Sequence, residues 1–457
     1  MSKKTIFGKP LRNVLAVVLT LLVLLGIFVG LFFYSRDTTE ETLPADYAEY
    51  EKGTVLEILT DNCTESEVAE SAMRGDQLLL VEVTSGQYKG ETLMVSHAVG
   101  PMYGEQAKVG QSIVMIISTY ADGSHRANLY EYNRTPAAII VIGLFILVTI
   151  LVGGRTGAKS IVGLLLTIAV LLAVFLPLLM KGWEPITTAF LLCSLVAVAC
   201  FVILDGWSRK ILCACVGTIG GMAMAMLFGI LVQKLLHLDG LRAEYAEALL
   251  QLRQTGTPVH IRGLLVAGVI ISALGAVMDV AMSISSAQSE LKAVNPAMTP
   301  KALWRSGMNI GRDMVGTMTN TLILAILGSS TVLILYLYSL NLSWHQLMSS
   351  SYVAIELISS VSSAIGVILA VPLTNLVGAF VFGSKRSAIA PPSATTPAAK
   401  SYSADDLSRA GQLLIAQGKQ PQFEKLLNQY GIQTIMQLEA NRYAAFAEDL
   451  KALGAPL

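Results

Sequence analysis

Residues 136–180 read PAAIIVIGLFILVTILVGGRTGAKSIVGLLLTIAVLLAVFLPLLM, which is two apolar runs with a short polar insert between them. Each run holds about 20 residues, the length at which a helix crosses the roughly 30 Å of hydrocarbon in a bilayer. Arg155 and Lys159 stand in the insert, and basic residues of this kind anchor a membrane surface. The stretch therefore predicts two transmembrane helices joined by a short basic loop.

The rest of the chain extends this pattern. Its 457 residues are 53% hydrophobic and only 14% charged, with a mean hydropathy of +0.60, so lipid is the solvent for much of it. Equal numbers of basic and acidic residues, 32 of each, provide no basic field, and we expect no nucleic-acid partner. The chain is expected to be an α-helical polytopic membrane protein of about eight transmembrane helices, near residues 14–34, 136–153, 159–180, 185–205, 211–235, 263–286, 313–340 and 352–382.

The distribution of charge predicts the orientation. Thirteen Lys and Arg residues lie in the flanks on one side of the expected spans and seven on the other, and the more basic side is cytoplasmic. Both termini are therefore expected in the cytoplasm, with residues 1–36 forming a cytoplasmic N-terminus and a membrane anchor that is retained. The four tryptophans fall near expected span ends, where an amphipathic ring is most stable: Trp183, Trp207, Trp304 and Trp344.

A soluble segment separates the first two spans. Residues 37–135 predict a small extracytoplasmic β-barrel or sandwich of about five strands, because short β-branched runs alternate with Gly and Asn turns, as at 54–59, 77–83, 92–95 and 112–119. We expect a structural or partner-binding role for this domain. It is one of two places where a protein partner is expected to dock.

The second such place follows the last span. After a seven-helix transmembrane core at 136–386, residues 387–400 form a Pro-, Ala-, Ser- and Thr-rich linker, and residues 401–457 predict a cytoplasmic helical bundle. The helix signals are Ser403-x-x-Asp406 as a capping box, Pro421 at a second helix start and Gly431 at its end. Within the core, the loop at 233–262 predicts a short amphipathic helix or a lid.

Patterns that indicate chemistry are weak in this sequence. Cys63 is alone in the soluble domain and the five histidines are scattered, so no metal site is expected. Residues 153–160, GGRTGAKS, approach a phosphate-binding loop, but Ala158 replaces its last glycine and membrane spans flank it. We therefore expect no catalytic residues, no cofactor and no enzyme.

Polar residues nevertheless recur inside the span at 263–286. Asp279 belongs to a stripe of small and polar side chains at three- and four-residue steps, together with Ser272, Ala276, Ser283 and Ser286. A carboxylate that faces lipid is costly, so the stripe is expected to face protein or water. Small residues at packing intervals are interpreted as helix contacts: Gly217, Gly221 and Ala225 in the span at 211–235, and Gly268, Ser272 and Ala276 in the next.

The following span carries a second polar face. Arg312, Gly316 and Asn320 share one side at four-residue intervals, with Asn309 and Asp313 adjoining. Two facing stripes form a candidate polar seam of Asp279, Ser283, Asn309, Arg312, Asp313, Asn320 and Thr321, with Glu356 and Asn375 as secondary candidates. The alternative interpretation is that Asp279 and Arg312 only neutralise each other and fix the helix register.

These motifs also carry a resemblance. In residues 275–287 (GAVMDVAMSISSA), 306–313 (SGMNIGRD) and 316–325 (GTMTNTLILA), the chain resembles the YibE/F-like family of bacterial membrane proteins, over roughly residues 50–385. The resemblance implies a multi-span core in the bacterial cytoplasmic membrane. It brings no established activity and so supplies no substrate.

Two function hypotheses follow, ahead of a third, an intramembrane enzyme, for which the sequence has paired acids but no legible nucleophile–base set. The first is a transporter or channel-like protein for an ion or small polar solute, with the polar seam lining the path. The second is a cell-envelope scaffold or sensor without transport, which links the outside β-domain to the cytoplasmic helical domain. The polar membrane interior favours the first, and the two soluble domains favour the second.

Overall fold

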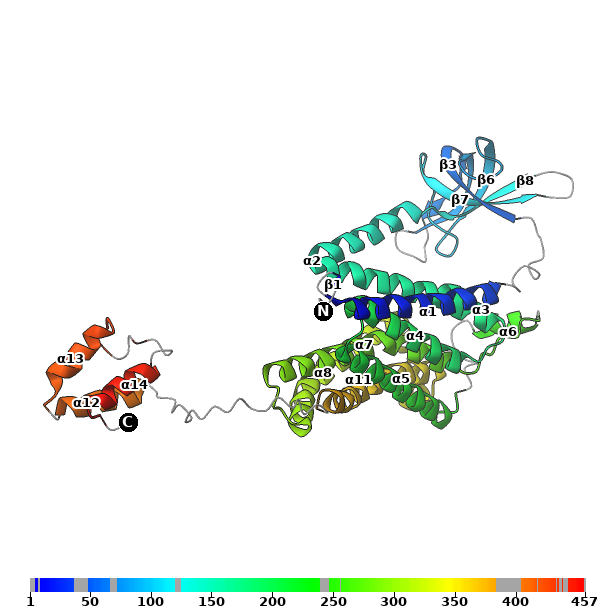
Figure 1. Cartoon of the computed structure of the whole chain (residues 1–457). Coiled ribbons are helices and arrows are strands. Elements are labelled where there is room, and N and C mark those ends of the chain that lie inside the picture. The colour runs from blue at the N-terminus through cyan, green and yellow to red at the C-terminus, as the bar shows by residue number, and fades with distance from the viewer. Residues whose placement is uncertain are drawn as a thin grey trace. The chain divides into compact units, whose positions relative to one another are not determined.

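The computed structural model describes residues 5–6, 9–36, 48–65, 72–119, 125–238, 246–254, 256–383, 404–416, 418–432, 434, 438 and 443–455. Most of this chain is helical, and it divides into two compact units, residues 1–385 and 386–457 (Figure 1). The first unit contains a β-domain and the helices of the core.

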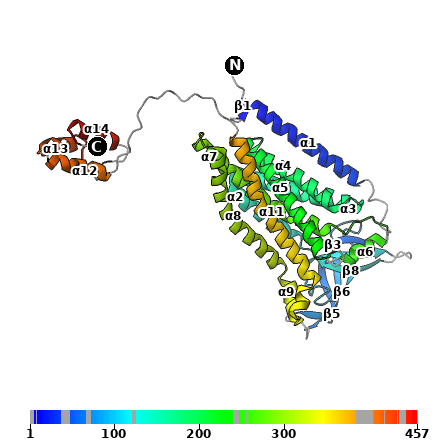
Figure 2. The ribbon, with the colours of Figure 1, turned by 90° about the horizontal axis from the view of Figure 1, so that it is seen from below.

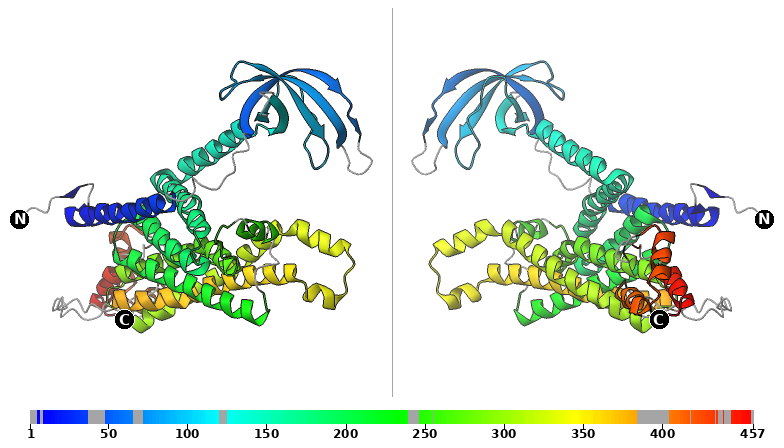
Figure 3. Two further views of the ribbon diagram at one scale, coloured as in Figure 1. Left: turned by 90° about the vertical axis from the view of Figure 1, so that its right-hand side faces the viewer. Right: turned by 90° about the vertical axis from the view of Figure 1, so that its left-hand side faces the viewer.

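The β-domain is a small closed barrel. Its strands are ordered β3-β7-β8-β6-β5-β4, and β3 also pairs with β5, which closes the sheet around five long strands (Figure 3). The strands are β3 Ala48–Asp61, β4 Thr64–Glu65, β5 Met73–Val83, β6 Thr92–Val99, β7 Ser112–Thr119 and β8 His125–Tyr132, and a separate short pair joins β1 Thr5–Ile6 to β2 Lys9–Pro10. The predicted β-barrel is confirmed.

Period-two alternation explains why these segments form the barrel. On β5, Leu79, Val81 and Val83 are buried while the residue between the last two, Glu82, is exposed. Because successive side chains of a strand point to opposite faces, one face supplies the core and the other faces solvent. Met115 on β7 belongs to the same core.

The remaining first-unit elements are helices. They are α1 Leu11–Arg36, α2 Thr135–Val170, the π-helical turn η1 Leu171–Phe175, α3 Leu176–Met180, α4 Pro185–Asp205, α5 Arg209–Leu235, α6 Ala246–Gln254, α7 Leu264–Val294, α8 Pro300–Ser329, α9 Thr331–Ser339, α10 Trp344–Met348 and α11 Ser351–Gly383. Polar caps set several starts, since Glu184, Ser208 and Thr299 each accept a hydrogen bond from a backbone N–H of the first turn. Helix α6 lies where the sequence predicted a short amphipathic helix.

Helices α5, α7 and α11 pack together at the centre of the core, and α4 and α8 pack on them (Figure 2). Glycine allows the closest approach. A Cβ on Gly221 of α5 would lie 2.7 Å from Val277 of α7 and 2.8 Å from Ala370 of α11. A Cβ on Gly366 would lie 2.7 Å from Ala225. The predicted packing role of the small residues of α5 is therefore confirmed.

The helices are those of a membrane-embedded protein, but the number of candidate spans differs from the eight that were predicted. Six helical segments of the described chain are long and apolar enough to cross a bilayer, and the bent pair α8 and α9 raises the number to seven. Residues 135–180 form one apolar helical segment of 46 residues where two spans with a loop were expected. At 1.5 Å per residue this is about 70 Å, twice the hydrocarbon thickness, and the backbone leaves helical geometry at Gly154.

The span expected at 313–340 also differs. Helix α8 begins thirteen residues earlier, because Thr299 caps it and Pro300 fits its first turn. The first turns carry Lys301, Arg305 and Arg312, so hydropathy alone does not reveal them. At Ser330 the chain bends by 59° into α9.

The second unit is a helical bundle, as predicted. It contains α12 Ala404–Ala416, α13 Gln420–Gln429 and α14 Tyr443–Ala452 around a core that includes Leu414, Leu426 and Phe446. Pro421 lies in the first turn of α13 and Gly431 follows its end with φ +70°, both as expected. The expected cap at Ser403 lies outside the described residues.

Candidate polar site in the membrane core

Asp279 lies at the midpoint of α7. The helix runs from Leu264 to Val294, so about 22 Å of helix extends from Asp279 to either end, a depth near the middle of a bilayer that the helix crosses. The Asp279 side chain is exposed although the next residues, Val280 and Ala281, are fully buried. The carboxylate forms no ion pair or hydrogen bond within the described chain.

An open stripe continues from Asp279 along α7. Between residues 264 and 284 the exposed positions are Gly268, Ser272, Gly275, Asp279 and Ser283, all small or polar and all on one face. A Cβ on Gly268 or Gly275 would meet no atom within 4 Å. The other faces of α7 pack on α5, α11, α4 and α8. Helix α7 is thus buried except along this narrow polar line.

One of the predicted helix contacts of α7 is absent from the described chain. Gly268 was expected to be a helix contact, but it is exposed and touches no neighbour in the described chain, so that prediction is wrong. Ser272 does reach α11, where its Oγ lies 2.9 Å from Oγ of Ser363. Ala276 is half-buried at the edge of the stripe, as is Ser286.

Helix α8 also presents its polar residues outward. Leu303, Gly307 and Gly311 are its buried positions. The candidate seam residues of this helix are all exposed: Asn309, Arg312, Asp313, Asn320 and Thr321. The Thr321 hydroxyl is hydrogen-bonded within the helix, because its Oγ1 donates to the carbonyl oxygen of Thr317 at 2.9 Å. The face of α8 that packs on other helices therefore carries the glycines Gly307 and Gly311, and the polar face is left exposed.

The structure does not pair Asp279 with Arg312. Neither residue takes part in an ion pair within the described chain, where Arg134–Glu131 and Lys210–Asp205 are examples of paired charges. Both seam charges are exposed instead, on neighbouring helices that pack together. The interpretation in which these two groups only neutralise each other thus lacks the contact it requires.

Asn375 has a different environment. It is fully buried in α11, and its Nδ2 donates to the backbone oxygen of Trp304 in α8 at 2.8 Å. Gln288 of α7, also fully buried, donates through Nε2 to the backbone oxygen of Asn375 at 3.1 Å and to its Oδ1. This amide node connects three helices, and its hydrogen bonds give Asn375 a structural role.

Glycine makes room for the node. A Cβ on Gly307 would lie 2.1 Å from Oδ1 of Asn375, and one on Gly378 would lie 1.6 Å from Oε1 of Gln288. The Gln288 Oε1 atom has no hydrogen-bond partner in the described chain. Glu356, the other secondary candidate, is half-buried near the start of α11 and remote in sequence from the node.

The sequence was also compared with known proteins. A family model described as YibE/F-like protein matches residues 141–384, which is more than half of the chain. The chain belongs to the YibE/F-like family. No curated protein and no solved structure matches it. The family match covers α4, α5, α7, α8 and α11, so the polar site lies within the part that defines a YibE/F-like protein.

Sequence reasoning missed two polar features of this YibE/F-like chain. One is Gln288, which a wheel of α7 would have placed on the face of Val277 and Ile284 rather than of Asp279. The other is a cavity of about 310 Å³ in the β-domain, lined by His97, Glu131 and Arg134 among others. His97 takes an inward position between Val95 and Val99 on β6, which is the signal that was available.

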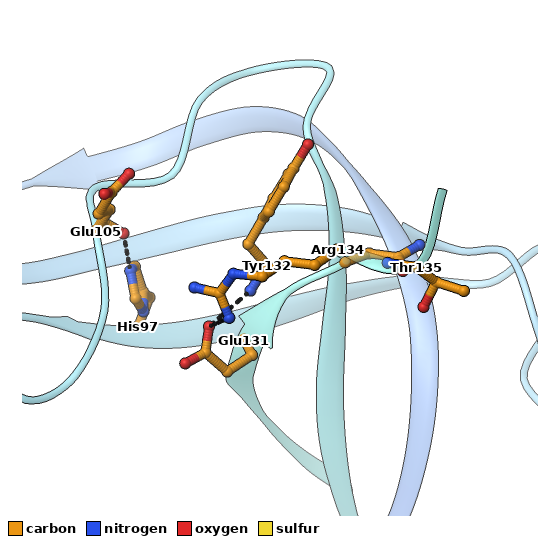
Figure 4. A network of polar contacts seen from close by, with 7 residues as sticks. His97, Glu105, Glu131, Tyr132, Arg134 and Thr135 are labelled. Atoms are coloured by element: carbon orange, nitrogen blue, oxygen red, sulfur yellow. Dashed lines mark hydrogen bonds and ion pairs between the residues drawn. The ribbon is translucent and has the colours of Figure 1, made fainter. Parts of the chain in front are cut away.

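Figure 4 shows the polar contacts of this cavity. Nε2 of His97 donates to the backbone oxygen of Glu105 at 2.8 Å, and Arg134 forms an ion pair with Glu131 at 2.8 Å. Arg134 directly precedes α2, so the cavity lies where the barrel continues into the helix. Across the described ranges, no three His, Cys, Asp or Glu side chains come together as a metal site would require.

Proposed function

We propose that this YibE/F-like protein moves an ion or a small polar solute across the membrane. The path is lined by the seam residues Asp279, Ser283, Asn309, Arg312, Asp313, Asn320 and Thr321. The observation that carries the proposal is the position of Asp279, at the midpoint of α7 on a stripe that is open to its surroundings. The proposal involves no enzymatic step.

The cost of a bare charge supports this function. An ionised carboxylate at the bilayer centre costs at least about 2.5–3.5 kcal/mol when it faces lipid, so it is retained facing water, a counter-charge or a solute. Gly275, one turn before Asp279, leaves open space beside it rather than a packed neighbour, and Gly268 leaves open space about two turns further along the stripe. A carboxylate in such an opening attracts cations, which makes a cation the first solute to test.

The test is flux through purified protein in proteoliposomes, with Na⁺, K⁺, Mg²⁺, protons and a panel of small metabolites as probes. We expect flux of at least one probe above empty vesicles, and its loss in Asp279→Asn. The matched control is Glu290→Gln, an exposed acid near the inner end of the same helix. Absence of flux for every probe, or equal flux in the two variants, would count against transport.

We also propose that the protein lies in a bacterial cytoplasmic membrane, as the resemblance to the YibE/F-like family implies, with both termini in the cytoplasm, as the charge bias indicates. Lys89 and Gln422 are exposed positions in the β-domain and the C-terminal bundle. In intact cells, Lys89→Cys should react with an impermeant maleimide and Gln422→Cys should not. The reverse pattern would overturn the orientation.

A second candidate function is a scaffold or sensor, and the cavity beside Arg134 favours it because a ligand there would sit next to the start of α2. A chain that ends before residue 387 separates the two functions. Transport predicts that it retains the cellular phenotype of the full chain. A sensor that signals through the C-terminal bundle predicts loss.

A further inference from the structure

The exposed side of α8 is a self-complementary surface. We define the α8 polar face as Asn309, Arg312, Asp313, Gly316 and Asn320, all of which are exposed. Gly316 follows the buried Gly307 by nine residues, about two and a half turns, and so lies on the opposite side of the helix. The helix is thus packed on one side and polar on the other.

This face is too polar for lipid. Arg312 lies seven residues beyond Arg305, which places it about 10 Å deeper along the helix. Charged side chains at membrane depth face protein or water rather than hydrocarbon. The ion pairs of the described chain lie elsewhere, so neither Arg312 nor Asp313 is neutralised within it.

The two charges flank the middle of the face. At 100° per residue, Arg312 lies about 40° to one side of Gly316 and Asp313 about 60° to the other, while Asn309 and Asn320 lie between Gly316 and Asp313, at about 20° and 40°. Arg312 and Asp313 also differ by only about 1.5 Å in depth. Two copies inserted in the same direction and related by a twofold axis along the membrane normal would bring opposite flanks together at equal depth.

We propose that a second copy of this chain covers the α8 polar face. Arg312 of each copy then forms an ion pair with the partner's Asp313, as flanking charges do in parallel two-stranded helix pairs. Both pairs form at once because the axis relates them. The partner is thus recognised by the same charges that make the face unsuitable for lipid.

The centre of the face fits close helix contact. A Cβ on Gly316 would meet no atom within 4 Å, so nothing in the described chain occupies the space beside it. Small residues at such positions let two helix backbones approach, and amides such as Asn309 and Asn320 hydrogen-bond across the interface. Self-association does not depend on transport. It leaves Asp279 and Ser283 of each copy as the seam groups free to meet a solute.

The test uses two charge variants that are each self-repelling. In Arg312→Asp chains the flanks carry two acids, and in Asp313→Arg chains they carry two bases. Chains with two different affinity tags are co-expressed in the three combinations and one tag is captured. We expect mixed acid–base pairs to co-purify at least about tenfold more than either like pair, which corresponds to about 1.4 kcal/mol. Equal recovery in all three combinations would overturn the proposal.

A cysteine variant keeps the test decisive if a charge variant fails to fold, because it leaves both charges in place. Asn320→Cys should form a disulfide-linked dimer when membranes are treated with a mild oxidant. The control is Leu227→Cys, on an exposed apolar position of α5. A dimer at the first position alone supports the interface. Equal cross-linking at both, or none at Asn320→Cys, would show that α8 faces water or another protein.

Discussion

The small and polar residues of the helical core have opposite environments on two of its surfaces. Between α5 and α11, glycine lets the helices pack closely, because a Cβ on Gly221 would lie within 3.0 Å of atoms of two other helices. Along α7 and α8, a Cβ on Gly275 or Gly316 would meet no atom of another element within 4 Å. The same residue type thus closes one surface and leaves another open.

The asparagines show the same contrast. Asn375 is fully buried and hydrogen-bonded to two other helices, whereas the Asn320 side chain is exposed and forms no hydrogen bond within the described chain. Buried polar groups with partners hold a fold together. Polar groups left open at membrane depth are retained for what they meet outside the chain. The difference assigns Asn375 to the fold and leaves Asn320 as a candidate for the proposed function.

The largest expected effect is at the closed surface. Gly221→Leu adds a side chain where Val277 Cγ1, Ala370 Cβ and the backbone oxygen of Gly366 already lie within 3.0 Å of the Cβ position. Overpacking of this kind should cost about 3 kcal/mol or more of folding free energy. The measurement is thermal stability in detergent, together with the yield of monodisperse protein.

Gly275→Leu is the matched control, because the new side chain enters open space. Its stability should stay within about 0.5 kcal/mol of the parent, while flux falls because the opening beside Asp279 is filled. Equal destabilisation of the two variants would show that the α7 stripe is packed in the working protein.

A smaller loss of folding free energy is expected when Asn375 is replaced, and almost none when Asn320 is replaced. Asn375→Leu leaves Nε2 of Gln288 and the Trp304 backbone oxygen with one buried partner fewer, which should cost about 2–3 kcal/mol. Asn320→Leu removes no described hydrogen bond and should change stability by less than about 0.5 kcal/mol.

The loss of flux should be larger in Asn320→Leu than in Asn375→Leu, which is the opposite order from the loss of stability. Asn320→Leu should lower flux by at least about tenfold, since one hydrogen bond lost to a solute, or to the partner copy that covers α8, is worth on the order of 1.4 kcal/mol. Flux measured per folded protein should be less affected in Asn375→Leu. An active Asn320→Leu protein beside an inactive, stable Asn375→Leu protein would reverse the assignment of the two residues.

Much of the fold could be predicted because its signals are local. The strand at 112–119 and the helix at 185–205 have the expected bounds, since period-two alternation and an uninterrupted apolar run define them. Strand β8 was missed because HRANLYEY mixes polar and aromatic residues without a clear alternation. The early start of α8 was missed because its charged first turns depress hydropathy.

The candidate site could be predicted only in part. The sequence placed Asp279 and Ser283 on one stripe correctly, because helical spacing determines which residues share a face. It could not show which way α8 turns, since that rotation is set by the contacts of Gly307 and Gly311 with other helices. Nor could it show that Asn375 is held by Gln288, which depends on three helices meeting.

The contrast can also be tested in the β-domain, where an exposed polar group meets water and the membrane helices are not involved. In the β-domain, burial and the hydrogen bond to Asp61 raise the pKa of the Cys63 thiol to about 11, against an ordinary value of 9.0. The thiolate is the reactive form, so at pH 8 Cys63 should react with iodoacetamide about a hundredfold more slowly than a cysteine in an unstructured peptide. Asp61→Asn removes the carboxylate and should raise the rate of labelling without changing the membrane helices.

The readout is labelling of the full chain in detergent between pH 8 and 10, with Cys63→Ser supplying the background from the buried membrane cysteines. A rate equal to that of the peptide would show that the strand end at Asp61 is open rather than hydrogen-bonded.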